Sequence, residues 1–224
     1  MNLNQARFES YPCEMEIFEL ESLFDVIDNF LKDEKAKKAH LTKDVLRRDD
    51  VFGNPNQILL AGVQIFRRQM VVLLQTHLEQ IIKDFSINIF IGKPEKMAGY
   101  ILLDEFQDGK DELGKILGEN KTANLNQLPA LATSKVIKGG LSKALERVKK
   151  LSNAKIKAHT KAVLAKLNET RTQIVHDTSD DEISKEFLHE CFEAVRDLIV
   201  SFREVCAENN ISDIEEFEEI NDGE

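Results

Sequence analysis

An arginine and a histidine five residues apart have the clearest chemical potential in this sequence. Arg171 and His176 lie in the run of residues 167–177. A guanidinium keeps its charge under all cellular conditions, whereas an imidazole gains and loses a proton near neutrality. Together these groups supply what phosphodiester cleavage needs: a cation for the phosphate oxygens and a group that transfers protons.

The two side chains can meet only if their helix ends or distorts before His176. On an unbroken helix, five residues at 100° each leave the side chains about 140° apart. Residues 179–182 read Ser-Asp-Asp-Glu and fit the S-x-x-E capping box, which predicts that a new helix begins near Ser179 and that a break precedes it. The sequence therefore predicts that Arg171 and His176 converge at a helix junction. In the competing interpretation, Arg171 pairs with Glu169 or Asp177 and His176 only caps its helix.

Other motifs match known sites only in part. Residues 109–116 follow a phosphate-binding loop as far as its lysine, but Ile116 stands where a hydroxyl must reach Mg²⁺. Glu186 and His189 have the E-x-x-H spacing of a carboxylate-bridged metal site, without the second copy that such a site needs. A surface ion pair is the better interpretation of this pair. The three cysteines form no C-x-x-C motif, so the sequence predicts neither a metal nor another cofactor.

The elements that must position these residues are predicted to be helices. Ten Gly, four Pro and 42% apolar residues favour an all-α bundle over a sandwich or barrel. Apolar residues recur at three- and four-residue steps in several segments. The segments are residues 14–39, 56–85 (expected to be the central, most buried helix), 141–151, 153–175 and 180–208.

We predict one domain over residues 1–208, with residues 86–138 as an insertion or lid. Glycines punctuate this stretch, residues 87–91 suit either a short strand or a helix end, and residues 97–106 and 111–117 suit short helices. Residues 209–224 are predicted to form an acidic tail. No apolar run approaches the roughly 20 residues of a membrane span, which predicts a cytoplasmic protein without membrane contact.

Charge is distributed unevenly along the chain. The net charge of −10 argues against non-specific coating of nucleic acid. Residues 135–171, however, contain eleven basic and two acidic residues, a local charge of +9, which leaves −19 for the remainder. These lysines are either the solvated faces of two helices or a strip that attracts phosphates.

The R-x4-H motif from Arg171 to His176 resembles the HEPN superfamily of all-α domains. A turn and a long amphipathic helix follow the motif, and a long apolar helix that contains Glu79 precedes it. The resemblance covers about residues 54–85 and 141–208. It implies a metal-independent endoribonuclease of a toxin-antitoxin or phage-defence system. Thr172 stands where members commonly carry Asn, Asp or His directly after the arginine.

The resemblance also implies how such an enzyme would work. RNA would be cleaved by attack of the ribose 2′-OH on phosphorus, giving a 2′,3′-cyclic phosphate, in an active site that a homodimer completes. His176 would transfer protons and Arg171 would hold the phosphate oxygens. Supporting roles fall to Asn168, Thr172, Glu79 and Lys166, and the basic strip would attract RNA. A cognate antitoxin or a companion defence protein is a further implied partner.

Two other functions stay open at this level. A non-catalytic helical module could hold a nucleotide or a partner's phosphate in the same place, and Thr172 favours that alternative. A plain scaffold dimer, in which long apolar helices pair between subunits, is the third.

Overall fold

The computed structural model describes residues 8–33, 35, 55–97, 100, 128–176 and 182–211. These residues form helices and no strand, which confirms the predicted all-α class. The described elements are α1 (Ser10–Lys32), α5 (Pro55–Gly92), the short 3-10 helix η2 (Pro94–Met97), α9 (Leu128–Ile137), α10 (Leu141–Ser152), α11 (Ala158–Val175) and α12 (Lys185–Glu208). The predicted short helices at residues 97–106 and 111–117 lie almost wholly outside the described residues.

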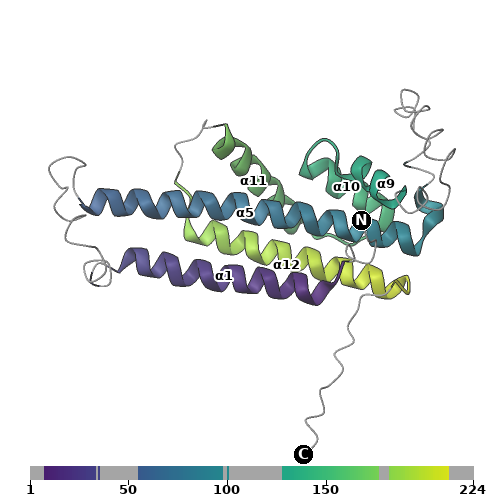
Figure 1. The fold of residues 1–224 in the computed structure, drawn as a ribbon, viewed down its shortest axis with the longest axis horizontal. Helices are drawn as coiled ribbons and strands as arrows, with labels where there is room; N and C mark the ends of the chain where they lie inside the picture. Colours follow the sequence, from purple (N-terminus) through teal and green to yellow (C-terminus); the bar gives the residue numbers. More distant parts are fainter. Residues whose placement is uncertain are drawn as a thin grey trace, which may run out of the picture.

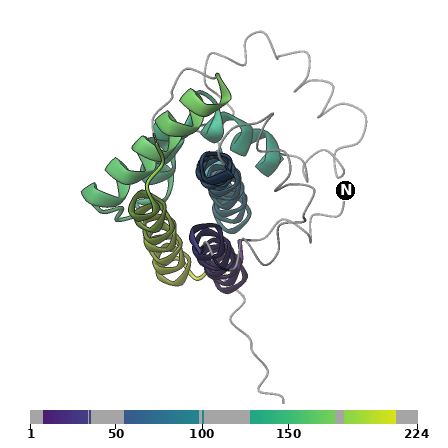
Figure 2. The ribbon, with the colours of Figure 1, turned by 90° about the vertical axis from the view of Figure 1, so that its left-hand side faces the viewer.

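Three long helices, α1, α5 and α12, run side by side (Figure 1). The end-on view in Figure 2 places α11 and α10 on the side of α5 away from α1. Helix α5 has 38 residues and is therefore about 57 Å long. Because α1, α9, α10, α11 and α12 all contact it, α5 is the central helix that its dense apolar sequence predicts.

Aromatic side chains fill one end of the core. The rings of Phe85 and Phe202 stack with their centroids 3.8 Å apart, and the edge of Phe8 meets Phe85 at 5.5 Å and Phe202 at 5.9 Å. All three side chains are fully buried. Asn88 Nδ2 donates a hydrogen bond to the backbone oxygen of Phe8 at 2.8 Å, which fixes the first described residue to α5.

The segment at residues 87–91 continues α5 as helix up to Gly92. Four of its five residues are buried. This apolar run is compatible with a strand in the sequence, but in the structure it is helical and packs into the core. Gly92 ends α5 beside Ile211, where a Cβ atom on Gly92 would lie 2.7 Å from Cγ1 of Ile211. Ile211 packs against the core, so the predicted acidic tail at residues 209–224 does not begin at 209. Residues 212–224 lie outside the described residues.

The bounds of three predicted helices are wrong. Helix α11 begins at Ala158 and not at residue 153. Helix α12 begins at Lys185 and not near Ser179, because Ser184 is the N-cap and its side chain accepts the backbone N–H of Phe187 at 3.1 Å. Residues 182–184 are not helical, and Ser179 itself lies outside the described residues. Helix α1 begins at Ser10 and ends at Lys32, before the predicted end at residue 39.

Helix α9 was not expected from the sequence, which places residues 128–137 within an insertion. The structure packs it on α5 and α10, with Thr133 and Val136 among its buried residues. Gly139 and Gly140, both at φ +92°, form the turn from α9 into α10. Arg147 then donates to the carbonyl oxygens of residues 135, 136 and 138 at the end of α9. Residues 128–138 are therefore part of the bundle.

Candidate functional site

Arg171 lies in the last turns of helix α11, and His176 directly follows its last residue, Val175. The C-cap of α11 is His176, whose backbone N–H donates to the oxygen of Thr172 at 3.1 Å, an i to i−4 bond. The last helical residue is thus Val175, and the helical hydrogen bonds extend to the backbone N–H of His176. With no distortion between them, the two side chains leave α11 about 140° apart. The predicted convergence needs a break or distortion before His176, and the backbone hydrogen bonds of α11 show none there.

Both side chains are nevertheless accessible, since Arg171 is half-buried and His176 is exposed. Within the part of the chain that the structure describes, neither side chain has a hydrogen bond or an ion pair. The pairing of Arg171 with Glu169 in the competing interpretation is not present, and Asp177 lies outside the described residues. That interpretation is right that His176 caps the helix.

Three residues predicted to support the site, Glu79, Asn168 and Thr172, form their hydrogen bonds with residues other than Arg171 and His176. The buried amide of Gln75 on α5 donates to Oε1 of Glu79 at 2.9 Å and to Oδ1 of Asn168 at 3.4 Å. Glu79 therefore accepts from Gln75, and no bond to Arg171 is present in the described part of the chain. Thr172 donates its hydroxyl to the backbone oxygen of Asn168 at 2.8 Å. Gln75, which sequence reasoning missed, fixes α11 to α5 through Asn168.

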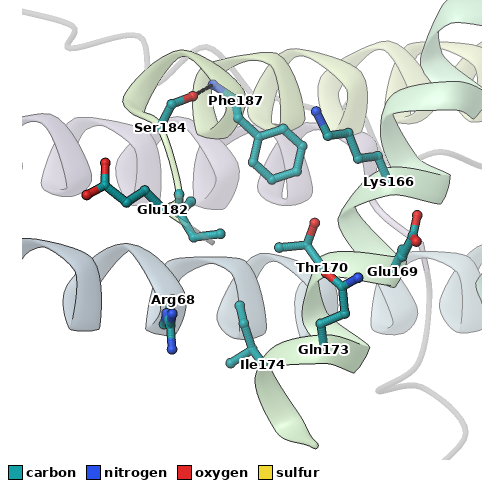
Figure 3. Close-up of a pocket in the computed structure, with 10 residues that line it drawn as sticks. Arg68, Lys166, Glu169, Thr170, Gln173, Ile174, Glu182, Ser184 and Phe187 are labelled. Carbon is teal, nitrogen blue, oxygen red and sulfur yellow. Dashed lines mark hydrogen bonds between the residues drawn. The ribbon is translucent and has the colours of Figure 1, made fainter. Parts of the chain in front are cut away.

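A cavity of about 370 Å³ opens between α5, α11 and the start of α12. Figure 3 shows its polar side chains around a common space. Two cations, two carboxylates, an amide, two hydroxyl groups and three apolar side chains line it: Arg68, Lys166, Glu169, Glu182, Gln173, Thr170, Ser184, Ile174, Ile183 and Phe187. Its volume lies within the range of small-molecule sites.

Only one predicted site residue, Lys166, lines this cavity, with its Nζ 4.9 Å from the centroid of the Phe187 ring. Arg171 is not among the lining residues. His176 follows the lining residue Gln173 by three positions. On a regular helix its side chain therefore leaves α11 about 60° round and about 4.5 Å further along than that of Gln173. His176 itself is not among the residues that line the cavity.

Side chains from α5 fix the wall of the cavity at Ile183. The backbone N–H of Ile183 donates to Oε1 of Gln64 at 2.8 Å, and its oxygen accepts from Nη1 of Arg67 at 2.9 Å. Nε of Arg67 also donates to Oδ1 of Asp28 at 2.7 Å, and Oδ2 of Asp28 pairs with Lys32 at 2.9 Å. Burial alone would raise the pKa of Asp28, but the hydrogen bonds from Arg67 and Lys32 outweigh it and lower that pKa.

A charged cluster joins α1 to α12 away from the cavity. His189 lies between two carboxylates, with Nδ1 2.8 Å from Oε1 of Glu21 and Nε2 3.2 Å from Oδ1 of Asp25. Lys185 pairs with Asp25 at 2.6 Å, and Arg196 pairs with Glu21. The hydrogen bond from Lys185 lowers the pKa of Asp25. His189 thus contacts carboxylates of α1, and the ion pair expected between Glu186 and His189 is not present among the described residues.

The basic strip is partly neutralised by bundle contacts. Lys157 pairs with Asp197 at 3.0 Å and Lys161 with Glu146 at 2.7 Å. In contrast, Lys149 and Lys150 on α10 are exposed. The strip therefore combines solvated lysines with lysines that tie the helices together.

Comparison with known protein families, curated proteins and solved structures gives no match for this chain. Among the described residues, no helix has the length and apolar character needed to cross a membrane. The same residues contain no group of three side chains suited to hold a metal ion. Function must be inferred from the contacts above.

Proposed function

We propose that this protein is a metal-independent endoribonuclease that uses His176 at the margin of the α5–α11–α12 cavity. One observation carries the proposal: the exposed His176 follows the lining residues Gln173 and Ile174 on the same helix by three and two positions, and two cations line that cavity. In this arrangement, Arg68 and Lys166 hold the phosphate, a role that the sequence assigns to Arg171. Arg171 then contacts a neighbouring phosphate from the other face of α11.

The composition of the cavity favours a nucleotide unit over a bare phosphate. Glu169 and Glu182 balance the charges of Arg68 and Lys166, so the cavity does not simply attract anions. Carboxylate oxygens and the amide of Gln173 can accept N–H groups from a base edge, while cations hold phosphate oxygens. A single-stranded RNA has both kinds of group within one nucleotide.

The chemistry is transfer of the phosphoryl group to a neighbouring hydroxyl. The ribose 2′-oxygen forms a bond to phosphorus, the bond from phosphorus to the 5′-oxygen breaks, and a 2′,3′-cyclic phosphate and a 5′-OH result. His176 takes the proton of the 2′-OH or supplies one to the leaving oxygen. The cations stabilise the charge that grows on the non-bridging oxygens.

Cleavage of single-stranded RNA by the purified protein, with chelator present, tests this proposal. We expect fragments with 2′,3′-cyclic phosphate ends, and no cleavage where 2′-deoxynucleotides replace ribonucleotides. His176→Ala should lower the rate by at least about 100-fold. Lys166→Ala should lower kcat/KM about 10- to 100-fold through the lost contact to phosphate. RNA that stays intact at every pH from about 5 to 9 would refute an enzymatic function.

His159 provides the matched control, because it is exposed at the opposite end of the same helix. His159→Ala removes the same chemical group about 25 Å away and should leave the rate unchanged. If both histidine variants lose activity equally, the loss reflects stability and not catalysis. Growth arrest on expression that disappears with His176→Ala would place the enzyme in a toxin or defence system.

The divergence of Arg171 and His176 favours one other arrangement, the composite site implied by the HEPN resemblance. Two groups that leave one helix in different directions can meet when Arg171 of one copy faces His176 of another. If Arg171→Ala and His176→Ala are each inactive, a mixture should regain about a quarter of wild-type activity, because half the dimers contain one intact site. No recovery would favour the site within a single chain.

A binding module without catalysis is the outcome if RNA is bound but not cut. Isothermal titration with nucleotides would then show binding that Lys166→Ala weakens. Neither binding nor cleavage would leave the cavity without a role in RNA chemistry.

A further inference from the structure

Five lysines gather around the C-terminal end of α10. Nζ of Lys96 in η2 donates to the backbone oxygen of Leu151 at 2.6 Å, so η2 lies against the last turn of α10. Lys149 and Lys150 in that turn are exposed, and Lys155 follows soon after with a side chain that is 81% exposed. We call this group the lysine cluster: Lys93, Lys96, Lys149, Lys150 and Lys155.

The lysine cluster carries more positive charge than its neighbours balance. Partial burial lowers the pKa of Lys96, and the nearby charge of Lys93 lowers it further. One neighbouring carboxylate, that of Glu146, already pairs at 2.7 Å with Lys161, which lies outside the cluster. In the described part of the chain, the carboxylates that interact with these lysines are Glu95, Glu146 and Glu208. The remaining positive charge attracts an anionic partner.

The end of α12 lies beside the same cluster. Ile211, the last residue that the structure describes, packs against the end of α5, and Nζ of Lys93 donates to Oδ1 of Asn209. On the other side, Oγ of Ser201 in α12 donates to the backbone oxygen of Lys155 at 3.4 Å. Figure 1 shows the last turns of α5 and α12 at the end of the bundle that also holds α9 and α10. The segment that follows Ile211 therefore starts at the lysine cluster.

Residues 212–224 have the composition of a ligand for such a surface. They include seven acidic residues and no basic one. Three apolar residues, Ile214, Phe217 and Ile220, recur among them at steps of three. Ile91 in the last turn of α5 is 41% exposed and offers an apolar contact near the cluster. Complementary charge and an apolar contact together favour this segment as the partner of the cluster.

The length of this segment is sufficient to cover the cluster. Its 13 residues can span about 43 Å when extended, whereas α10, with 12 residues, is about 18 Å long. A segment attached to its own binding surface has an effective concentration of about 1 mM. It therefore occupies the lysines ahead of a free anion at micromolar concentration, even though each exposed ion pair is weak.

We propose that residues 213–222 bind to the lysine cluster of their own chain and keep phosphate-bearing ligands off these lysines. The contact consists of exposed ion pairs, so salt weakens it and a longer polyanion displaces it. This inference does not rest on the proposed function, because it concerns the other end of the bundle. The cavity lies at the start of α12, and its lining residue Phe187 is 21 residues, or about 32 Å, from Glu208 at the end of that helix.

Cross-linking with a carbodiimide tests the contact directly, because this reagent joins a carboxylate to a lysine amine only where the two groups touch. We expect mass spectrometry to find links from residues 213–222 to the lysine cluster at least about five times as often as links to Lys166. Lys166 is the matched control, since it is exposed but lies near Phe187 at the start of α12. An equal mixture of chains with light and heavy nitrogen shows whether each link forms within one chain. Equal linking of Lys166, or links that join two chains, would overturn the proposal.

Neutralising two carboxylates gives an independent measurement. Glu215→Gln with Glu218→Gln should bind an oligothymidylate DNA of about 20 nucleotides about 3- to 10-fold more tightly than wild type at low salt, the effect of two surface ion pairs. The difference should disappear at about 0.5 M salt. Glu190→Gln with Glu193→Gln is the matched control, because these exposed residues of α12 have the same spacing, and it should leave the affinity unchanged.

Two results of this titration would overturn the proposal. One is the same affinity for the DNA in wild type and in the first variant, and the other is an equal gain in both variants. DNA lacks the 2′-OH that the proposed cleavage requires, so neither measurement depends on ribonuclease activity. Each therefore fails or succeeds separately from the proposed function.

Discussion

Replacing Arg67 with methionine tests whether a buried ion pair holds the wall of the cavity. In the variant, Asp28 keeps only Lys32 as a partner and the oxygen of Ile183 loses its 2.9 Å bond. Asp28 is fully buried and Arg67 is 7% exposed. Removing one partner of a buried ion pair typically lowers the free energy of unfolding by about 3–5 kcal/mol.

We expect Arg67→Met to lower the free energy of unfolding by about 3 kcal/mol, the lower end of that range, because Lys32 still pairs with Asp28. For a chain of this size, the loss corresponds to a decrease in Tm of about 6–12 °C. Urea denaturation followed by circular dichroism gives the free energy, and a thermal scan gives Tm. The variant should also bind nucleotides more weakly, because Gln64 alone then holds Ile183.

The double variant Asp28→Leu, Arg67→Met provides the control. Apolar residues leave no unpaired buried charge, so it should be more stable than Arg67→Met alone. A loss below 1 kcal/mol in Arg67→Met, or a double variant less stable than the single, would refute the reasoning.

Acid provides a second readout of the same pair. The pKa of Asp28 is lower in the folded protein than in the unfolded chain, so the pair stabilises fully above the unfolded value. This stabilisation is lost as the pH falls through the folded pKa. The difference in stability between wild type and Arg67→Met should therefore shrink below about pH 4.

Further predictions concern packing and thiol chemistry. Gly92→Ala should cost about 1–3 kcal/mol in urea denaturation, because its Cβ would lie 2.7 Å from Ile211, and the cost should fall in an Ile211→Ala background. Equal costs in the two backgrounds would exclude the clash as their cause. Burial raises the pKa of Cys191 to about 12, so this thiol should resist alkylation at pH 8 while the half-buried Cys13 reacts. Mass spectrometry of a short iodoacetamide treatment distinguishes the two, and rapid labelling of Cys191 would contradict its burial.

The sequence predicted the presence of helices wherever the apolar pattern is dense. It did not predict the residues at which those helices begin and end. Both Ser179 and Ser184 are plausible caps in sequence, since Ser, Thr, Asp and Asn all favour that position. Contacts from α5 decide between them, because Gln64 and Arg67 hold the backbone of Ile183 in a non-helical segment just before Ser184. Such contacts join residues 116–119 positions apart and leave no local signal.

The candidate site was predictable in part for the same reason. The spacing of Arg171 and His176 identified the correct end of α11, but their relative direction depends on where the helix stops. Lys166 belongs to the expected basic strip, whereas Arg68 and Gln75 lie on a distant helix. Nothing in their local sequence distinguishes a polar residue that lines a cavity from one that faces water.

The position of Phe8 has a consequence for protein synthesis. Its ring contacts Phe85 and Phe202, so the aromatic end of the core cannot close until residues near 202 have left the ribosome. The nascent chain must keep the segment around Phe8 undocked, and open to chaperones, until α12 has emerged. Any truncation that removes Phe8 would take this ring out of the core, so Phe8 should be kept in shortened versions of the chain.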